Sequence, residues 1–156
     1  MNNFQRVDSI SNAHVGRDFE AVARDYFKQN GIHLVEGVSL PIGVNQSKKR
    51  HVFDLGNTSD IGEKMIVECK SHKWTSGENV PSAKLTVWNE AMYYFLLAPT
   101  EYRKIFFILK DYSVKRDLTL GQYYLQNYKH LIPDDVEIIE YDENEMSACV
   151  IKSIIE

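Results

Sequence analysis

Two carboxylates and a lysine stand in the middle of the chain with a spacing that suits metal-assisted hydrolysis. Asp54 is followed, after thirteen intervening residues, by Glu68 and Lys70, which are separated only by Cys69. On a strand, Glu68 and Lys70 share one face because side chains alternate, and a hairpin would bring Asp54 beside Glu68. Two converging carboxylates repel each other and favour a cation, and their hard oxygen ligands suit Mg²⁺. Lys70 could then orient or deprotonate a water that the metal has acidified, or stabilise the charge that grows on a phosphate.

A plainer interpretation is that Glu68 and Lys70 form the polar face of an edge strand, as a solvated ion pair worth little. The neighbouring segment 65–67 is wholly apolar, and so is the segment 105–109. These runs favour a central strand, in which an acid and a lysine would be costly without a function. Cys69 should point to the opposite face, into the core, which argues against a nucleophilic cysteine.

The elements that must position these residues follow from the hydrophobic pattern. A helix is expected over about 13–30, since apolar residues recur at helical spacing from Phe19 to Phe27, with Ser11 or Asn12 as its cap. A second helix should open at Pro81 and end at 98–99, and a third should start at a Thr119–Gln122 capping box. Strands are expected at 33–44, 50–55, 64–73, 103–112 and 136–141. The segment 146–155 fits neither period.

The expected order is therefore α-β-β-β-α-β-α-β, which predicts an α/β fold with a mixed sheet flanked by helices. The chain carries no repeat, low-complexity segment or Pro/Gly/Ser-rich linker, so residues 1–156 are expected to form a single domain.

At this point the chain resembles a known family. Phe53-Asp54, thirteen residues and then Glu68-Cys69-Lys70 is similar to the signature of the PD-(D/E)xK nucleases, the restriction-endonuclease-like superfamily. The expected elements over residues 13–110 also resemble that family's common core of a helix, three antiparallel strands, a helix and a strand. Phe53 stands where many members have a proline. The resemblance implies a restriction-endonuclease-like fold and a Mg²⁺-dependent endonuclease acting on DNA, with Mn²⁺ as a substitute.

The resemblance also implies roles for individual residues. In the family, the aspartate and glutamate bind the metal and the lysine assists the water, and these roles would fall to Asp54, Glu68 and Lys70. Many members add a glutamate from the first helix, to which Glu20 corresponds, although a glutamate at the solvent edge of that helix is nearly as good an interpretation. The implied metal-binding positions are Asp54, Glu68, Cys69 and Glu20.

Five basic or aromatic residues near this motif are candidates for binding nucleic acid. Lys73 and Trp74 follow the motif directly and could grip a phosphate and stack on a base, although a strand end with a half-buried tryptophan explains them equally well. Lys84 could approach a phosphate from the second helix. Lys49 and Arg50 could clamp the backbone, but a charged loop is commoner.

Charge permits this function without indicating it. The net charge is −4, but residues 133–156 hold eight acidic side chains and one basic, which leaves 17 Lys and Arg against 14 Asp and Glu over residues 1–132. The two cysteines cannot form a disulfide framework, and no apolar run is long enough to span a membrane. With no apolar leader at the N-terminus, a cytoplasmic location is expected.

The leading hypothesis is thus a Mg²⁺-dependent DNA endonuclease, which at 156 residues would work as a homodimer with one active site for each strand. A catalytically silent domain that binds nucleic acid or a partner protein is the alternative. A metal-dependent hydrolase acting on another substrate is a third possibility.

Overall fold

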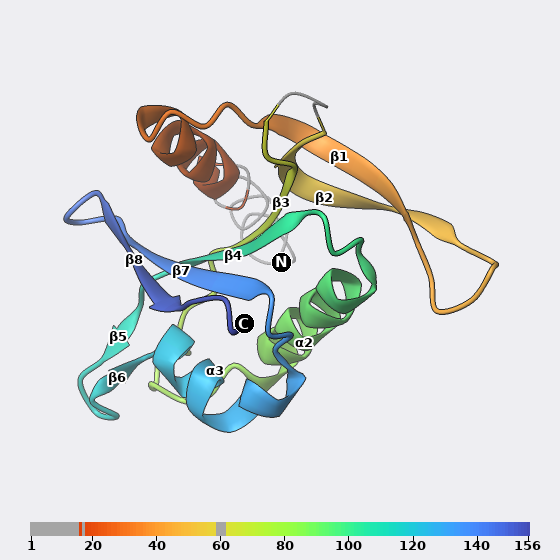
Figure 1. The fold of residues 1–156 in the computed structure, drawn as a ribbon. Helices are drawn as coiled ribbons and strands as arrows, with labels where there is room; N and C mark the ends of the chain where they lie inside the picture. Colours follow the sequence, from red (N-terminus) through yellow and green to blue (C-terminus); the bar gives the residue numbers. More distant parts are fainter. Residues whose placement is uncertain (1–15, 17, 59–61) are drawn as a thin grey trace, which may run out of the picture.

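A six-stranded mixed sheet with helices on both faces forms the centre of the molecule (Figure 1). The computed structural model describes residues 16, 18–58 and 62–156. The sheet has the order β1-β2-β3-β4-β7-β8, made of β1 (Val35–Ile42), β2 (Lys49–Asn57), β3 (Met65–Lys70), β4 (Arg103–Leu109), β7 (Val136–Asp142) and β8 (Ser147–Lys152). The pairs β3–β4 and β4–β7 are parallel, and the other three pairs are antiparallel. The predicted α/β class and mixed sheet are confirmed.

Each face of the sheet has its own core. The first helix, described over 18–29, packs on one face through Phe19, Ala23 and Phe27, against the odd-numbered residues of β3. Helices α2 (Ser82–Leu97) and α3 (Leu120–Tyr128) cover the other face, and a short 3₁₀ helix, η1 (Lys129–Leu131), follows α3. Because both faces are covered, residues 65–69 of β3 are all buried, as expected for a central strand.

The ends of two helices follow the local sequence signals. Pro81 directly precedes α2, which ends at Leu97, just before Ala98 and Pro99. At the start of α3 the predicted capping box is present, because Gln122 N donates to Thr119 Oγ1 and Thr119 N donates to Gln122 Oε1. The start of the first helix, with the predicted caps Ser11 and Asn12, lies outside the described residues.

The predicted element order is wrong in two places, where the structure has three further strands. A small hairpin of β5 (Tyr112–Ser113) and β6 (Leu118–Thr119) lies between β4 and α3, and β8 follows β7. Strands of two residues are too short to show a period. Strand β8 lies at the edge of the sheet and has no fully buried residue. Its sequence therefore lacks the regular alternation of apolar and polar residues that predicts a strand.

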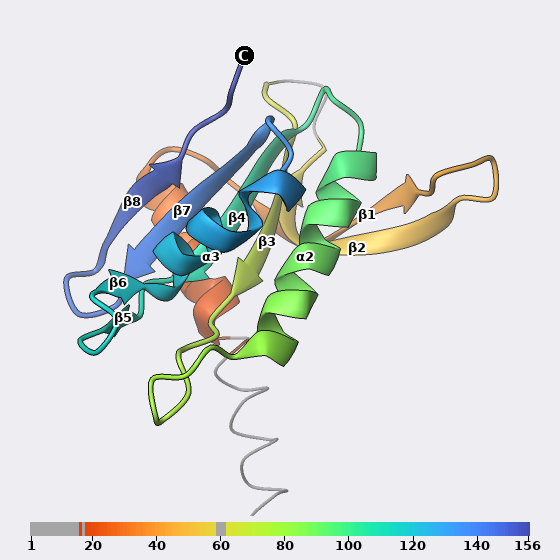
Figure 2. The ribbon, with the colours of Figure 1, turned by 90° about the horizontal axis from the view of Figure 1, so that it is seen from below.

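The course of β2 decides where the candidate site lies. Only the C-terminal end of β2, at Leu55, Gly56 and Asn57, pairs with β3. The earlier part of β2 pairs with β1 alone, and the two strands form a hairpin that projects from the body of the molecule (Figure 2). Phe53 packs in the α2 core, whereas Leu55 packs in the core of the first helix. Residues two apart on a regular strand share a face, so β2 turns at Asp54, at the point where it leaves β3.

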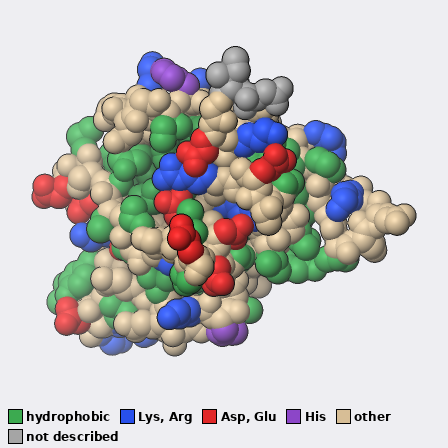
Figure 3. Space-filling model, viewed as in Figure 1, with side chains coloured by type: hydrophobic (Ala, Val, Ile, Leu, Met, Phe, Trp, Pro, Cys, Tyr) green, Lys and Arg blue, Asp and Glu red, His purple; other side chains and the backbone are tan. Residues whose placement is uncertain are grey.

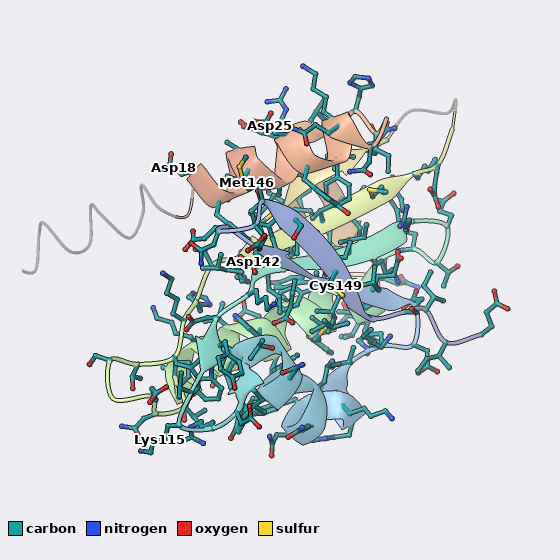
Figure 4. The ribbon with its side chains drawn as sticks, turned by 90° about the vertical axis from the view of Figure 1, so that its left-hand side faces the viewer. Asp18, Asp25, Lys115, Asp142, Met146 and Cys149 are labelled. Atoms are coloured by element: carbon teal, nitrogen blue, oxygen red, sulfur yellow. The ribbon has the colours of Figure 1, made fainter. Side chains whose placement is uncertain are left out.

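Among the described residues, none of the helices combines the length and the apolarity that spanning a membrane requires. Both cysteines are free: Cys69 is buried in the core of the first helix, and Cys149 is exposed on β8 (Figure 4).

Candidate active site

Asp54 lies against β3 at the point where the two strands separate. Its Oδ2 accepts a hydrogen bond of 2.8 Å from the backbone N–H of Cys69, next to Glu68. The side chain thereby takes the backbone donor that a continuing ladder would have used. This contact anchors Asp54 beside the Glu68–Lys70 segment, although the two strands no longer pair there.

Glu68 is almost completely buried, with 5% of its surface exposed. Its Oε1 lies 3.2 Å from Nε2 of His51, and the His51 ring stacks on Tyr94 of α2 with 3.7 Å between ring centroids. Burial raises the pKa of Glu68 to about 7, the Asp54 charge adds to this rise, and the His51 hydrogen bond and the Lys70 charge oppose it. His51 is thus part of the site. On a regular strand His51 lies on the same face as Phe53 and on the opposite face from Asp54, so strand alternation alone does not place it near the carboxylates.

Glu20 reaches the same place from the first helix. Burial and the Asp54 charge raise the pKa of Glu20 to about 7, and a hydrogen bond between the two carboxyl groups adds to the effect. A hydrogen bond between two carboxyl groups requires a proton on one of them. Asp18, two residues earlier and so on a different side of the helix, is exposed near the start of the described helix (Figure 4). The helix therefore brings Glu20, and not Asp18, to Asp54.

A pocket of about 700 Å³ opens over these groups. Glu20 and Asp54 line it from the first helix and β2, while Lys70, His72 and Lys84 line it from the end of β3 and the start of α2. The acidic and basic groups thus enter the pocket from different elements. Glu68 lies behind the pocket wall, turned toward His51.

The candidate nucleic-acid residues divide into two groups. Lys73 and Lys84 line the pocket over the carboxylates, and Lys73 is exposed, 3.7 Å from Glu143. Lys49 and Arg50 line a separate cavity of about 620 Å³ between the β1–β2 hairpin and α2. Arg50 is held there by hydrogen bonds to the side chain and the backbone carbonyl of Ser39.

Trp74 is not placed to stack on a base. Its ring is 7% exposed, and its indole N–H donates to the Asp111 carbonyl at 3.0 Å. Tyr123 packs edge-on against the ring, and the Arg116 guanidinium lies 5.1 Å above it. The ring is occupied on its polar and apolar sides, so base stacking on Trp74 forms no part of the function proposed below.

The carboxylates of Asp54 and Glu68 are engaged in hydrogen bonds within the protein. Among the described residues, no three His, Cys, Asp or Glu side chains are placed so that together they could hold a metal ion as they stand. Asp54 accepts from Cys69 N–H, while Glu68 is turned to His51. The Cys69 thiol faces the core, and burial raises its pKa well above the usual range, so it is not a thiolate ligand. Glu20, Asp54 and Glu68 carry carboxylate oxygens, the ligand type that hard divalent cations prefer.

Comparisons of the chain with protein-family models, with curated proteins and with solved structures found no significant match. The chemistry of the site therefore has to be argued from its own geometry.

Proposed function

We propose that the protein is a metal-dependent endonuclease of the PD-(D/E)xK kind, with Asp54, Glu68 and Lys70 as its catalytic residues and Glu20 as a further carboxylate. One observation carries the proposal: Glu20 and Asp54 line one pocket where β2 leaves β3, Glu68 lies on the adjoining segment of β3, and Glu20 and Glu68 each have a pKa raised to about 7. Such clusters are costly in a folded protein unless a cation or a reaction uses them.

Mg²⁺ is the proposed cofactor, and Mn²⁺ is expected to replace it, since both accept carboxylate oxygens. When bound, the metal supplies an acidified water and neutralises negative charge. Lys70 is partly exposed in the same pocket, so its amine is free to contact the attacking water or the phosphate. Glu20 and Asp54 hold the cation, and Glu68 joins them on losing its proton.

The proposed substrate is DNA, because Lys70, Lys73 and Lys84 line the pocket with cationic groups, which attract a phosphate backbone. Incubation with plasmid, single-stranded DNA, branched DNA and RNA in Mg²⁺ determines the substrate. The described residues contain one such centre, so we expect a homodimer for cutting both strands of a duplex, which sedimentation measures.

The decisive variant is Lys70→Ala. Loss of the amine should lower metal-dependent cleavage by at least about a hundredfold, the usual effect of removing a group that assists proton transfer. Lys129→Ala is the matched control, since Lys129 is exposed on η1 and does not line the pocket. Thermal unfolding of both variants should match the parent protein. Cleavage that survives in Lys70→Ala would remove the hypothesis.

The second candidate is a silent nuclease-like domain that binds nucleic acid or a partner. It is favoured by one observation, the hydrogen bond that joins Glu68 to His51. In a silent domain this bond would persist in millimolar Mg²⁺ or Mn²⁺, and neither ion would stabilise the fold. Metal-linked stabilisation therefore separates the two candidates.

A further inference from the structure

His72 lies just after β3 and is joined to the core by an unusual hydrogen bond. The indole N–H of Trp88 donates to Nδ1 of His72 at 2.8 Å, and the two rings stack with their centroids 6.2 Å apart. Trp88 lies on α2 and is fully buried between Phe106 and Tyr124. Because an indole nitrogen can only donate, Nδ1 of His72 must be the unprotonated, accepting nitrogen.

This bond determines where the histidine carries its proton. A neutral imidazole that accepts at Nδ1 carries its hydrogen on Nε2. Burial and, to a lesser extent, the charges of Lys84 and Lys70 lower the pKa of His72 to about 4, so the ring is neutral at physiological pH. Within the described part of the chain, Trp88 provides the one hydrogen bond made by this ring. The bond to Trp88 also fixes the direction of the Nε2–H group, for which no acceptor is found among the described residues.

His72 and Lys84 both line the pocket over the carboxylates, on the side formed by α2. The first turn of α2 carries no acidic side chain, so no acid in that turn repels an anion there. We propose that the His72 Nε2–H and the Lys84 ammonium form a seat for a phosphate oxygen, beside the candidate cation site. The proposal rests on the proposed function, in which this oxygen belongs to the DNA backbone. A neutral donor of fixed direction orients the phosphate, and Lys84 supplies the charge.

The simpler role for His72 is to satisfy the buried Trp88 N–H. His72→Asn separates the two roles, because the Asn carbonyl can still accept from Trp88 while its amide ends short of the Nε2 position. His33→Asn is the matched control, since His33 is exposed and lines a different pocket. Unchanged thermal unfolding of His72→Asn would show that the contact with Trp88 survives.

The experiment uses nitrogen NMR of the histidine rings at neutral pH, with titrations of inorganic phosphate and of a short DNA duplex in Ca²⁺. In the free protein, His72 should show a bare Nδ1 and a protonated Nε2. Both ligands should shift the Nε2 signal, and His72→Asn should weaken duplex binding by about tenfold, the usual effect of losing a hydrogen bond to a charged group. His33→Asn should bind like the parent.

A proton on Nδ1, a charged ring, or a His72 signal that ignores both ligands would overturn the proposal. Equal duplex affinity in His72→Asn and the parent would do the same. A response to phosphate that is lost in His72→Asn, in a protein that cleaves no nucleic acid with Mg²⁺ or Mn²⁺, supports the seat and removes the endonuclease. The two failures are therefore distinguishable.

Discussion

At the scale of single residues, the candidate site is defined by the protonation of its carboxyl groups. Glu68 sits in an environment that disfavours its charge, because it is buried and the negative charge of Asp54 acts on it. His51 is the main group that opposes this effect, through the hydrogen bond to Oε1. The balance leaves the pKa of Glu68 near 7, where small changes in its surroundings decide whether it is charged.

Glu68→Gln should stabilise the metal-free protein at about pH 8. A carboxyl whose pKa is raised on folding binds protons more readily in the folded state, so it adds stability at low pH that is lost as pH rises from 4.5 to about 7. The neutral amide removes this loss, and the free energy of unfolding should increase by about 2 kcal/mol. Urea unfolding at about pH 5 and pH 8 measures the difference, which should be confined to the higher pH. Equal stability at both values would contradict the raised pKa.

His51→Phe should make metal binding require a higher pH. Phenylalanine preserves an aromatic ring for stacking on Tyr94 but removes the hydrogen bond that lowers the pKa of Glu68. Protons then compete with the metal over a wider range. Calorimetric titration with Mn²⁺ between about pH 6 and 8.5 should show an upward shift of the midpoint, with equal affinities at the alkaline end. His130→Phe, at an exposed position on η1, is the control and should leave the midpoint in place.

At the scale of elements, the site depends on where β2 stops pairing with β3. Gly56 lies within the last three paired residues of β2, opposite Ile66. A Cβ at Gly56 would lie 2.6 Å from the Met65 carbonyl oxygen and 2.8 Å from a methyl of Val38. Since the first of these is a backbone atom, the strands would have to move apart.

Gly56→Ala should therefore destabilise the fold by about 2 kcal/mol, the usual cost of overpacking a close contact. It should also weaken Mn²⁺ binding, because Asp54 lies two residues beyond on the same strand. Gly16→Ala is the comparison for stability, since a Cβ there meets nothing within 4 Å. Chemical denaturation and calorimetry measure the two effects. A variant as stable as the parent would show that β2 and β3 can separate without penalty.

At the scale of the whole molecule, the acidic C-terminal segment does not form a separate negative region. Strand β7 pairs with β4, which brings acidic residues in and just before β7 close to basic residues in and just after β4. The ion pairs are Asp135 with Lys104, Glu137 with Arg103 and Asp142 with Lys110. On the face in Figure 3, acidic and basic side chains are interspersed. The positive balance of residues 1–132 is thus partly neutralised in the fold. Attraction of a nucleic-acid backbone would therefore depend on the lysines that line the pocket.

Metal binding should stabilise the whole protein more at about pH 8 than at pH 6. Glu20 and Glu68 have pKa values of about 7, so at pH 6 a cation has to displace their protons and at pH 8 it does not. Millimolar Mg²⁺ or Mn²⁺ should raise the melting temperature at the higher pH and have little effect at the lower. Ca²⁺-free buffer with EDTA provides the reference. An equal rise at both values would place the metal elsewhere.

The sequence by itself determined what depends on neighbours along the chain. Alternation on β3 put Cys69 in the core of the first helix, as predicted, and the apolar run of β4 indicated a strand buried on both faces. The capping box of α3 and the break at Pro99 needed only local hydrogen bonding and sterics. These features could be predicted because a strand or helix imposes its period on a few consecutive residues.

Only the tertiary structure decided which distant side chains meet. The turn of β2 at Asp54, the hydrogen bond from His51 to Glu68 and the contact of Trp88 with His72 each join different elements. The burial of Trp74 and the pairing of the C-terminal acids with basic residues around β4 also depend on how elements pack. Strand register and helix packing set these contacts. Neither produces a repeating pattern in the sequence, because each depends on the combined fit of many side chains across the sheet.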